Sequence, residues 1–409
     1  MHLIPAIARE NPYRRYWCGE TATVLGYQML AIAMGWQVYN LTDSALSLGL
    51  IGLAQFLPQF LLALLAGHVA DRYDRRRVVL LCQLLKFGIA LALAIGSETG
   101  YVTGPLLYFY AFLIGIASAF QSPSLRSMLP SLVQRADLPR CLAWSGAVRK
   151  FAVVTGPALG GLLYALGAWV VYGLAAMVFI AAGVLLRNVP QQRVERSREP
   201  VTLQILLGGI AHIRRTPVLL GAMTLDLFAV LLGGAVALLP VYARDILHTG
   251  SWGLGLLRAA PAVGALLASA WLVRSPLTAR VGHVMYGSVA VFGACMIVFG
   301  ISTSFYLSLV ILMISGAADM VSVVIRSSLV QLETPDDKRG RVTAVSALFN
   351  STANQLGQFE SGVVAAWLGT VPSVVLGGIG TVLVAGLWIR LFPPLFEREA
   401  LVRPVKDAA

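Results

Sequence analysis

The chain has 409 residues, of which 57% are hydrophobic and only 12% are charged, and its formal net charge is +12. An average soluble domain carries about 25% charged residues, so this chain has too few polar side chains to cover a surface that faces water. The composition excludes an ordinary soluble protein and indicates one surrounded by lipid. The basic residues fall in short loops between apolar runs, so nucleic-acid binding is not expected despite the positive charge.

Apolar runs of about 20 residues, the length that crosses a bilayer core of about 30 Å, recur along the whole chain. Charged residues, glycines and prolines mark the ends of these runs. The runs predict an all-α membrane protein with twelve transmembrane helices. The first six spans cover residues 16–39, 46–70, 78–97, 103–125, 141–166 and 168–187. The second six cover residues 217–240, 251–273, 283–302, 304–325, 343–368 and 371–392.

Lys and Arg residues gather in alternate loops, beginning with the N-terminus and the loop between the second and third spans. By the positive-inside rule, this alternation places both termini in the cytoplasm. Arg244 is the main exception, since it lies in a loop expected on the outer side. We find no cleavable signal pattern at the N-terminus, so we expect the first span to direct insertion.

The chain divides near its middle. Residues 188–203 form the longest polar stretch, and the following stretch to 215 has apolar and basic faces typical of a short interfacial helix. We therefore expect an N-terminal six-helix bundle over 1–187, a cytoplasmic linker over 188–215, and a C-terminal six-helix bundle with a tail over 216–409. An internal repeat supports this division, because Arg126-Ser127 matches Arg326-Ser327 and Val38-Tyr39 matches Val241-Tyr242.

The loop between the second and third spans carries the first motif. It reads GHVADRYDRR and resembles the G-x-x-x-D-R-x-G-R-R signature of the major facilitator superfamily, through Gly67, Asp71, Arg72, Arg75 and Arg76. Asp74 departs from the glycine that is usual there, and we expect Asp to accept the backbone geometry of the turn. The resemblance implies two pseudo-symmetric six-helix bundles and a role for Asp71 in stabilising one side of alternating access. The alternative is a charged loop that only fixes topology.

The fifth span carries the second motif, GPALGG, with Gly156, Pro157, Gly160 and Gly161. It is similar to the GPxxGG element of proton-antiporter branches of the superfamily, and it favours export. Physically, Gly and Pro kink a spanning helix and allow a neighbouring helix to approach closely. A generic kinked, tightly packed helix is the alternative.

Over nearly its whole length the chain most resembles the bacterial enterobactin-exporter and drug-efflux subfamily, notably in WQVYNLTDSALSLGLIGLAQFLP and SLVQRADLPRCLAWSGAV. The resemblance implies a monomeric, multi-pass protein of the bacterial inner membrane. Its partners would be a small-molecule substrate, protons and the lipid bilayer, and no cofactor is expected. The predicted function is proton-coupled export of a small amphipathic or anionic compound, such as a siderophore or drug, by alternating access.

Ionisable residues deep in a span are costly in lipid and so are expected to face a cavity or a partner. Asp226 lies about 14 Å into the seventh span and is the best mid-membrane carboxylate. A carboxylate in apolar surroundings binds a proton more readily than in water. Asp226, then Asp319 and Glu20, are therefore the proton-coupling candidates. The alternative is structural ion pairing, of Asp226 with Arg258 or of Asp319 with Arg326.

The resemblance also implies that spans 1, 4, 7 and 10 line the central cavity. The substrate-cavity candidates are Gln28, Trp36, Gln121, Arg126, Phe228 and Arg326 on or at the ends of these spans, together with Arg258 on the eighth span. For Arg126 and Arg326 the favoured interpretation is an anchor that extends to the membrane interface, and the alternative is a role in gating the inner mouth or binding an anionic substrate. Lys86 lies on the third span, outside this set, and is expected to serve packing or pairing.

Other function classes have little support. The sequence holds no Walker A loop, no nucleophile–base constellation and no metal-ligand cluster, so neither an enzyme nor a metal site is expected. Cys18, Cys82, Cys141 and Cys295 show no pairing pattern and are expected to be free. The alternative functions are an importer or a lysophospholipid flippase on the same scaffold, and a non-transporting receptor.

Overall fold

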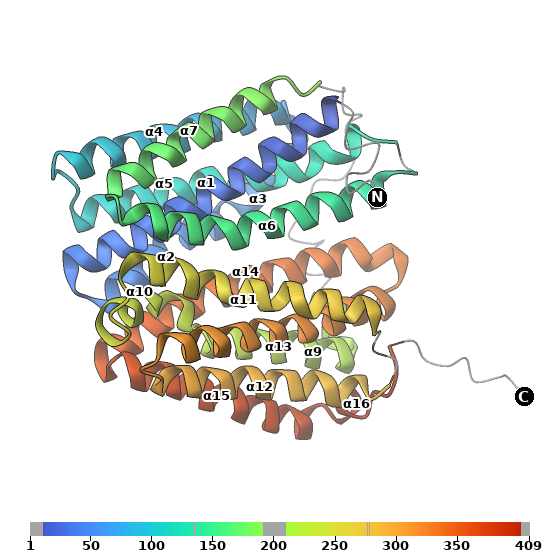
Figure 1. Cartoon of the computed structure of the whole chain (residues 1–409). Helices are drawn as coiled ribbons and strands as arrows, with labels where there is room; N and C mark the ends of the chain where they lie inside the picture. Colours follow the sequence, from blue (N-terminus) through green and yellow to red (C-terminus); the bar gives the residue numbers. More distant parts are fainter. Residues whose placement is uncertain (1–10, 135, 191–209, 276, 278, 402–409) are drawn as a thin grey trace, which may run out of the picture. The chain divides into compact units, whose positions relative to one another are not determined.

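The computed structural model describes residues 11–134, 136–190, 210–275, 277 and 279–401, and the side chains at positions 11, 64, 71, 336, 337, 344 and 347 lie outside this description. Within these residues the regular secondary structure is helical, with no strand (Figure 1). The predicted all-α fold class is confirmed.

The chain packs into two compact units. Unit 1 consists of Met1–Val201 and Tyr242–Ala259, and unit 2 of Thr202–Val241 and Ala260–Ala409. The segment Tyr242–Ala259 comes from the second half of the chain but packs with the first half. The predicted linker 188–203 lies mostly outside the described residues, and of the predicted interfacial helix only residues 210–215 are described, which are helical.

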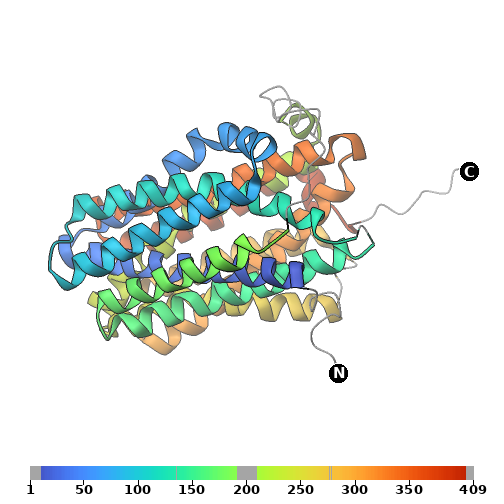
Figure 2. The same ribbon diagram turned by 90° about the horizontal axis from the view of Figure 1, so that it is seen from above.

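Unit 1 contains the helices of the first half of the chain. In order these are α1 (Asn11–Thr42), α2 (Ala45–Leu61), α3 (Ala63–Arg72), α4 (Arg75–Glu98), α5 (Gly104–Met128), η2 (Leu129–Ser131), α6 (Leu138–Tyr164) and α7 (Ala168–Arg187). The π-helical turn η4 (Tyr242–Ile246) and the first part of α11 (Gly250–Arg274) complete the unit. The long helices run alongside one another in both views, with α1 against α6 and α7, and α4 against α5 and α7 (Figures 1 and 2).

Glycines set the closest helix approaches in unit 1. A Cβ atom on Gly115 of α5 would collide with the backbone carbonyl of Gln55 on α2, so these two helices meet backbone to backbone. Close packing through small residues is how helices associate in lipid, where burying apolar surface gives little driving force. The contact with Gly115 therefore fixes the position of Gln55 relative to α5.

Unit 2 begins with α9 (Pro217–Leu232), η3 (Ala235–Leu238) and α10 (Leu239–Val241). It continues with the rest of α11 and then α12 (Val281–Ile301), α13 (Phe305–Leu332), α14 (Asp336–Leu368), α15 (Thr370–Leu391) and α16 (Pro393–Phe396). The predicted span 217–240 is not one continuous α-helix, because α9 ends before Gly233 and a 3-10 turn follows. A Cβ atom on Gly234 would lie 2.5 Å from the carbonyl oxygen of Gly357, so the backbone of α14 packs against this break.

Each of the twelve predicted spans coincides with helical segments of the structure. Eight helical stretches in the described part of the chain are long and apolar enough to cross a membrane by themselves, and these contain α4, α5, α7, α9, α11, α12, α13 and α15. The helix α2 is shorter, and α1, α6 and α14 are long enough but more polar. The count of twelve therefore stays a prediction, while a multi-pass membrane protein is established.

The surface of the helices supports the same conclusion. Leu81, Leu84 and Ile95 of α4 are 67%, 62% and 58% exposed. Large apolar side chains exposed in such numbers are costly in water and are accommodated by lipid. None of the four cysteines forms a disulfide bond; Cys82, Cys141 and Cys295 are buried, and Cys18 is half-buried.

Candidate functional site

A buried ion pair joins α9 and α13 in unit 2. The Asp226 carboxylate Oδ2 lies 2.6 Å from Arg326 Nη1, and both side chains are only 4% exposed. Burial removes water from both charges, so each depends on the other for its stability. The midspan position predicted for Asp226 thus corresponds to a carboxylate that is enclosed and paired.

Asn350 of α14 completes the pair. With its amide nitrogen turned toward the carboxylate, Asn350 donates to Asp226 Oδ2 at 3.0 Å and accepts from Arg326 Nη2 at 3.3 Å. The guanidinium Nε of Arg326 and the hydroxyl of Ser322, one turn away on α13, have no hydrogen-bond partner among the described residues. The site therefore retains unused hydrogen-bonding capacity beside the ion pair.

Two of the alternatives for these charges are corrected. The ion-pair partner of Asp226 is Arg326 and not Arg258. Arg326 is also not an anchor that extends to the membrane interface, because its side chain is buried within unit 2. The physical reason is that α9 and α13 are neighbours in space, so the two charges neutralise each other inside the unit.

The predicted cavity residue Gln121 lies beside a cation that we expected only to pack or pair. Lys86 of α4 is 3% exposed and donates from Nζ to Gln121 Oε1 on α5 at 2.6 Å. Lys86 Nζ also lies 5.6 Å from the ring centroid of Tyr27 on α1. A buried polar cluster therefore exists in unit 1 as well as in unit 2.

The remaining cavity candidates are placed differently. Gln28 is half-buried on α1, and its Cβ lies 2.6 Å from the position that a Cβ on Gly156 would take. Trp36 is 7% exposed and packs edge-on against Tyr164 of α6, with ring centroids 6.4 Å apart. Phe228 stacks at an angle on Trp388 of α15 at 5.2 Å. Trp36 and Phe228 thus make helix–helix contacts within their units.

Glu20 and Arg126 belong to a third group of charges. The positive charges of Arg149 and Arg126 act on the half-buried carboxylate of Glu20 on α1. Arg126 is exposed, in contrast to Arg326, its counterpart in the internal repeat. Asp319 is half-buried on α13.

Arginines of the 67–76 motif hold together the ends of several helices of unit 1. Arg75 donates from Nε to Ala70 O at 3.1 Å and from Nη1 to Ser127 O at 2.8 Å. Arg76 donates from Nη1 to Arg187 O at 3.3 Å. These carbonyls lie near the C-terminal ends of α3, α5 and α7, where unpaired backbone oxygens favour positive charge.

The other positions of this motif are simpler. Asp74 is the N-cap of α4, with φ −60°, and its side chain accepts from Arg76 N and Arg77 N. The expectation that Asp74 must accommodate a special turn geometry is therefore wrong, since this φ is open to any residue. A Cβ on Gly67 would meet nothing within 4 Å. Arg72 lies 3.5 Å from His68, while the side chain of Asp71 is outside the described residues.

The GPALGG motif on α6 packs against two helices. A Cβ on Gly160 would lie 2.6 Å from Ile32 of α1, and one on Gly161 would lie 2.7 Å from the Cα of Gly255 on α11. Gly156 also faces α1, and Pro157 lies within the helix. The predicted close approach of neighbouring helices is confirmed at these glycines.

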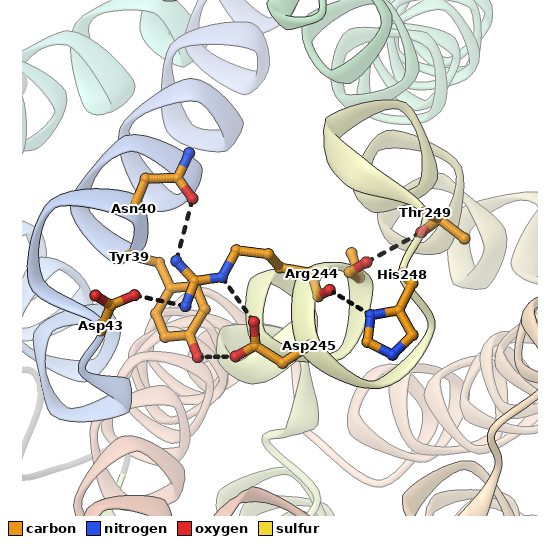
Figure 3. A network of polar contacts seen from close by, with 8 residues as sticks. Tyr39, Asn40, Asp43, Arg244, Asp245, His248 and Thr249 are labelled. Atoms are coloured by element: carbon orange, nitrogen blue, oxygen red, sulfur yellow. Dashed lines mark hydrogen bonds and ion pairs between the residues drawn. The ribbon is translucent and has the colours of Figure 1, made fainter.

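A network of charges lies at the C-terminal end of α1 (Figure 3). Arg76 lies at the other end of unit 1, near the N-terminal end of α1, since Arg76 donates to Val189 O and Arg15 of α1 donates to the adjacent Asn188 O. Arg244 contacts Asp43 at 2.6 Å and Asp245 at 2.7 Å, and its guanidinium lies 4.1 Å from the ring centroid of Tyr39. The Tyr39 hydroxyl donates to Asp245, and Arg244 donates to Asn40 at 3.4 Å. The exceptional arginine of the loop pattern is thus balanced by two carboxylates.

Sequence reasoning missed several of these residues. Lys86 was set aside because its span does not line the cavity implied by the resemblance, and Asn350 is one of several polar residues on α14. Asp43 and Asp245 carry a weak signal, since each lies near a position that the repeat matches. No group of three or more metal-ligating side chains occurs in the part of the chain that the structure describes.

An all-helical membrane fold with buried charges in each unit is typical of membrane transporters. This is a secondary transporter and not an enzyme. A model of the transmembrane secretion effector family matches residues 5–406, and the chain belongs to that family.

Relatives and solved structures are consistent with this assignment. The chain is 25% identical over 403 residues to the enterobactin exporter EntS of Citrobacter koseri, covering 97% of this chain and 95% of that protein. Its fold is similar to a variant of the nucleoside transporter NupG, with TM-score 0.75 and 13% identity over 93% of this chain and 100% of that chain. It is also similar to a bacterial homologue of the iron transporter ferroportin in an inward-facing state, with TM-score 0.70 and 19% identity over 94% of this chain and 98% of that chain.

Proposed function

We propose that this transporter exports a small amphipathic or anionic compound in exchange for protons, by alternating access, with Asp226 carrying the proton. The observation that carries the proposal is the enclosed Asp226–Arg326 pair, with both side chains 4% exposed. Ionisable groups inside a membrane protein are costly and mark proton or substrate pathways by default.

The chemistry of this pair suits a proton-operated switch. While Asp226 is ionised, its charge is balanced by Arg326 and its Oδ2 accepts from Asn350. A proton on Asp226 would remove the attraction and leave Arg326 as a buried cation without a counter-charge. Because an uncompensated buried charge is unfavourable, protonation would favour a different arrangement of the helices that carry these residues.

Alternating access requires the ends of the molecule to open in turn. By the positive-inside rule, the end with Arg75 and Arg76 is cytoplasmic, and the end with the Arg244 network faces outward. The network joins α1 to η4, two segments about 200 positions apart in sequence. We propose that it stabilises the outward-closed state and breaks when the outer side opens.

Export and the class of compound rest on the relatives. The family description names secretion, and the relative from Citrobacter koseri is described as an exporter of enterobactin. A siderophore of that kind is therefore the first compound to test. The fold alone does not select a direction, since the same architecture serves transporters of different solutes.

The test is transport by the purified protein in proteoliposomes with an imposed proton gradient, using enterobactin and a pH-sensitive dye. We expect the compound to move opposite to the protons, and Asp226→Asn to abolish both gradient-driven transport and substrate-driven proton movement. Glu98→Gln, which removes an exposed carboxylate at the end of α4, is the matched control and should behave as the wild type. Unchanged coupling in Asp226→Asn would exclude Asp226 as the proton carrier, and movement in the same direction as the protons would indicate import.

A further inference from the structure

Unit 1 buries a cation that has no carboxylate to balance it. Lys86 lies about 16 Å along α4, near the middle of the helix, and is 3% exposed. Its hydrogen-bond partner is the neutral amide oxygen of Gln121 at 2.6 Å. No carboxylate among the described residues forms an ion pair with Lys86. The ammonium group thus retains donors and charge that the protein does not satisfy.

The polar atoms around Lys86 are also incompletely used. Because Gln121 directs its Oε1 toward the ammonium, its Nε2 points elsewhere, and this buried donor has no partner among the described residues. Gln83 lies three residues before Lys86 on the same face of α4, and its Oε1 is a buried acceptor without a partner. Ser118 lies three residues before Gln121 on α5, and its hydroxyl is unpartnered too.

The other side of this cluster is held in place by α1 and α2. The ring of Tyr27 lies 5.6 Å from Lys86 Nζ, and the Tyr27 hydroxyl donates to Gln55 Oε1 at 2.8 Å. Gln55 is positioned by the close contact of α2 with Gly115. The positive charge of Arg258, also in unit 1, acts on Tyr27. The cluster therefore combines the Lys86 cation with an aromatic ring and amide groups, and its residues come from α1, α2, α4 and α5.

We propose that Lys86, Gln121 and Gln83 form a binding site for an anionic oxygen group of the transported compound, with a neighbouring hydroxyl. Lys86 and the Gln121 Nε2 donate to the anion, and the Gln83 Oε1 accepts from the hydroxyl. The proposal deepens the proposed function, and rests on it only in taking the anion to be part of the exported compound. It assigns recognition to unit 1, whereas proton coupling is assigned to Asp226 in unit 2.

The chemistry favours an anion over a purely structural role. A structural lysine at this depth would need a carboxylate or several acceptors to offset the cost of burying its charge, and Lys86 has one amide acceptor and one ring face. An incoming anion supplies the missing counter-charge, and charge-assisted hydrogen bonds to it are the strong ones. Ordered water would satisfy the amides but would leave the charge uncompensated.

The test is equilibrium binding by the full-length protein in detergent, without a proton gradient. The probes are 2-hydroxybenzoate, an anion with an adjacent hydroxyl, and 2-hydroxybenzamide, its neutral analogue, and binding is measured by calorimetry. We expect the wild type to bind the anion and not the amide. Lys86→Met should weaken anion binding by at least about 30-fold, as expected when one partner of a buried charged hydrogen bond is removed.

Two further variants keep the test decisive. Gln121→Leu should weaken anion binding while leaving the fold intact, and Lys150→Met removes an exposed lysine of α6 and should change nothing. Thermal unfolding of each variant establishes that it is folded. Absence of anion binding by the wild type, equal binding of anion and amide, or unchanged binding in a folded Lys86→Met protein would overturn the proposal. None of these results depends on proton coupling, so a failure of the proposed antiport in proteoliposomes is a separate outcome.

Discussion

The two units each bury a cation on a long helix, but they compensate it in opposite ways. In unit 2, Arg326 is paired with Asp226 at 2.6 Å and supported by Asn350. In unit 1, Lys86 has an amide acceptor and an aromatic ring and no carboxylate. The ion pair in unit 2 is electrically neutral without a ligand and can be broken by protonation of Asp226. The unbalanced charge of Lys86 instead favours binding of an anion. The comparison therefore favours anion recognition in unit 1 and proton coupling in unit 2.

The internal repeat sharpens this contrast. Arg126 and Arg326 occupy matched positions, yet Arg126 is exposed and Arg326 is buried. At the offset of 203 residues that relates Tyr39 to Tyr242, the position of Asp226 corresponds to Thr23. Thr23 accepts a hydrogen bond from Gln83 and cannot balance a charge. The two halves therefore differ at the position that supplies the carboxylate of the ion pair in unit 2.

The largest effect is expected from removing the two buried cations one at a time. Arg326→Gln leaves Asp226 buried without its partner and should destabilise the protein by about 3–5 kcal/mol, the usual cost of breaking a buried pair. Lys86→Met removes an unbalanced charge and should leave stability unchanged or raise it. Unfolding in detergent at fixed pH measures both. Equal losses of stability in the two variants would show that Lys86 is balanced within the protein and would remove the contrast between the units.

The next largest effect concerns Asp226→Asn combined with Arg326→Gln. Removing both charges of a buried pair is often nearly neutral, so the double variant should regain most of the stability lost in Arg326→Gln and lie within about 2 kcal/mol of the wild type. It should nevertheless show no proton-driven transport. Recovery of stability together with proton coupling would mean that the pair is only structural.

A smaller effect is expected at a glycine that supports the Lys86 cluster. Gly115→Ala forces α5 away from the Gln55 backbone and should cost about 1–3 kcal/mol, as other overpacked contacts do. It should also weaken binding of 2-hydroxybenzoate, since Gln55 positions Tyr27. Gly88→Ala is the control, because a Cβ there meets nothing within 4 Å. If neither Gly115→Ala nor Gly88→Ala changes anion binding, the cluster does not depend on the contact between α2 and α5.

The smallest change in stability is expected in the Arg244 network, because its ion pairs with Asp43 and Asp245 are partly exposed to solvent. Arg244→Gln should cost only about 0.2–1 kcal/mol, the range of exposed ion pairs. The same energy would shift an opening equilibrium by up to about 5-fold. A cysteine introduced at Thr42 should therefore react faster with a maleimide in the Arg244→Gln background. An unchanged rate would argue against a role for this network in outward closure.

Much of the helical frame could be predicted because span length and apolar composition are local properties. The break after Leu232 was missed, because Gly233 and Gly234 are common within membrane helices and become a break only where α14 packs against them. The importance of Asp226 followed from the cost of a charge at its depth. Its partner did not, because sequence spacing does not reveal which helices are neighbours. Lys86 was undervalued for the same reason, since its contact with Gln121 joins two spans.

The most direct test of the division between the units measures anion binding and substrate-driven proton movement on the same two variants. We predict that Asp226→Asn loses proton movement and retains binding of 2-hydroxybenzoate, and that Lys86→Met loses anion binding in a folded protein whose Asp226–Arg326 pair is intact. Loss of anion binding in Asp226→Asn, anion binding retained in a folded Lys86→Met protein, or substrate-driven proton movement that persists in Asp226→Asn would contradict the account.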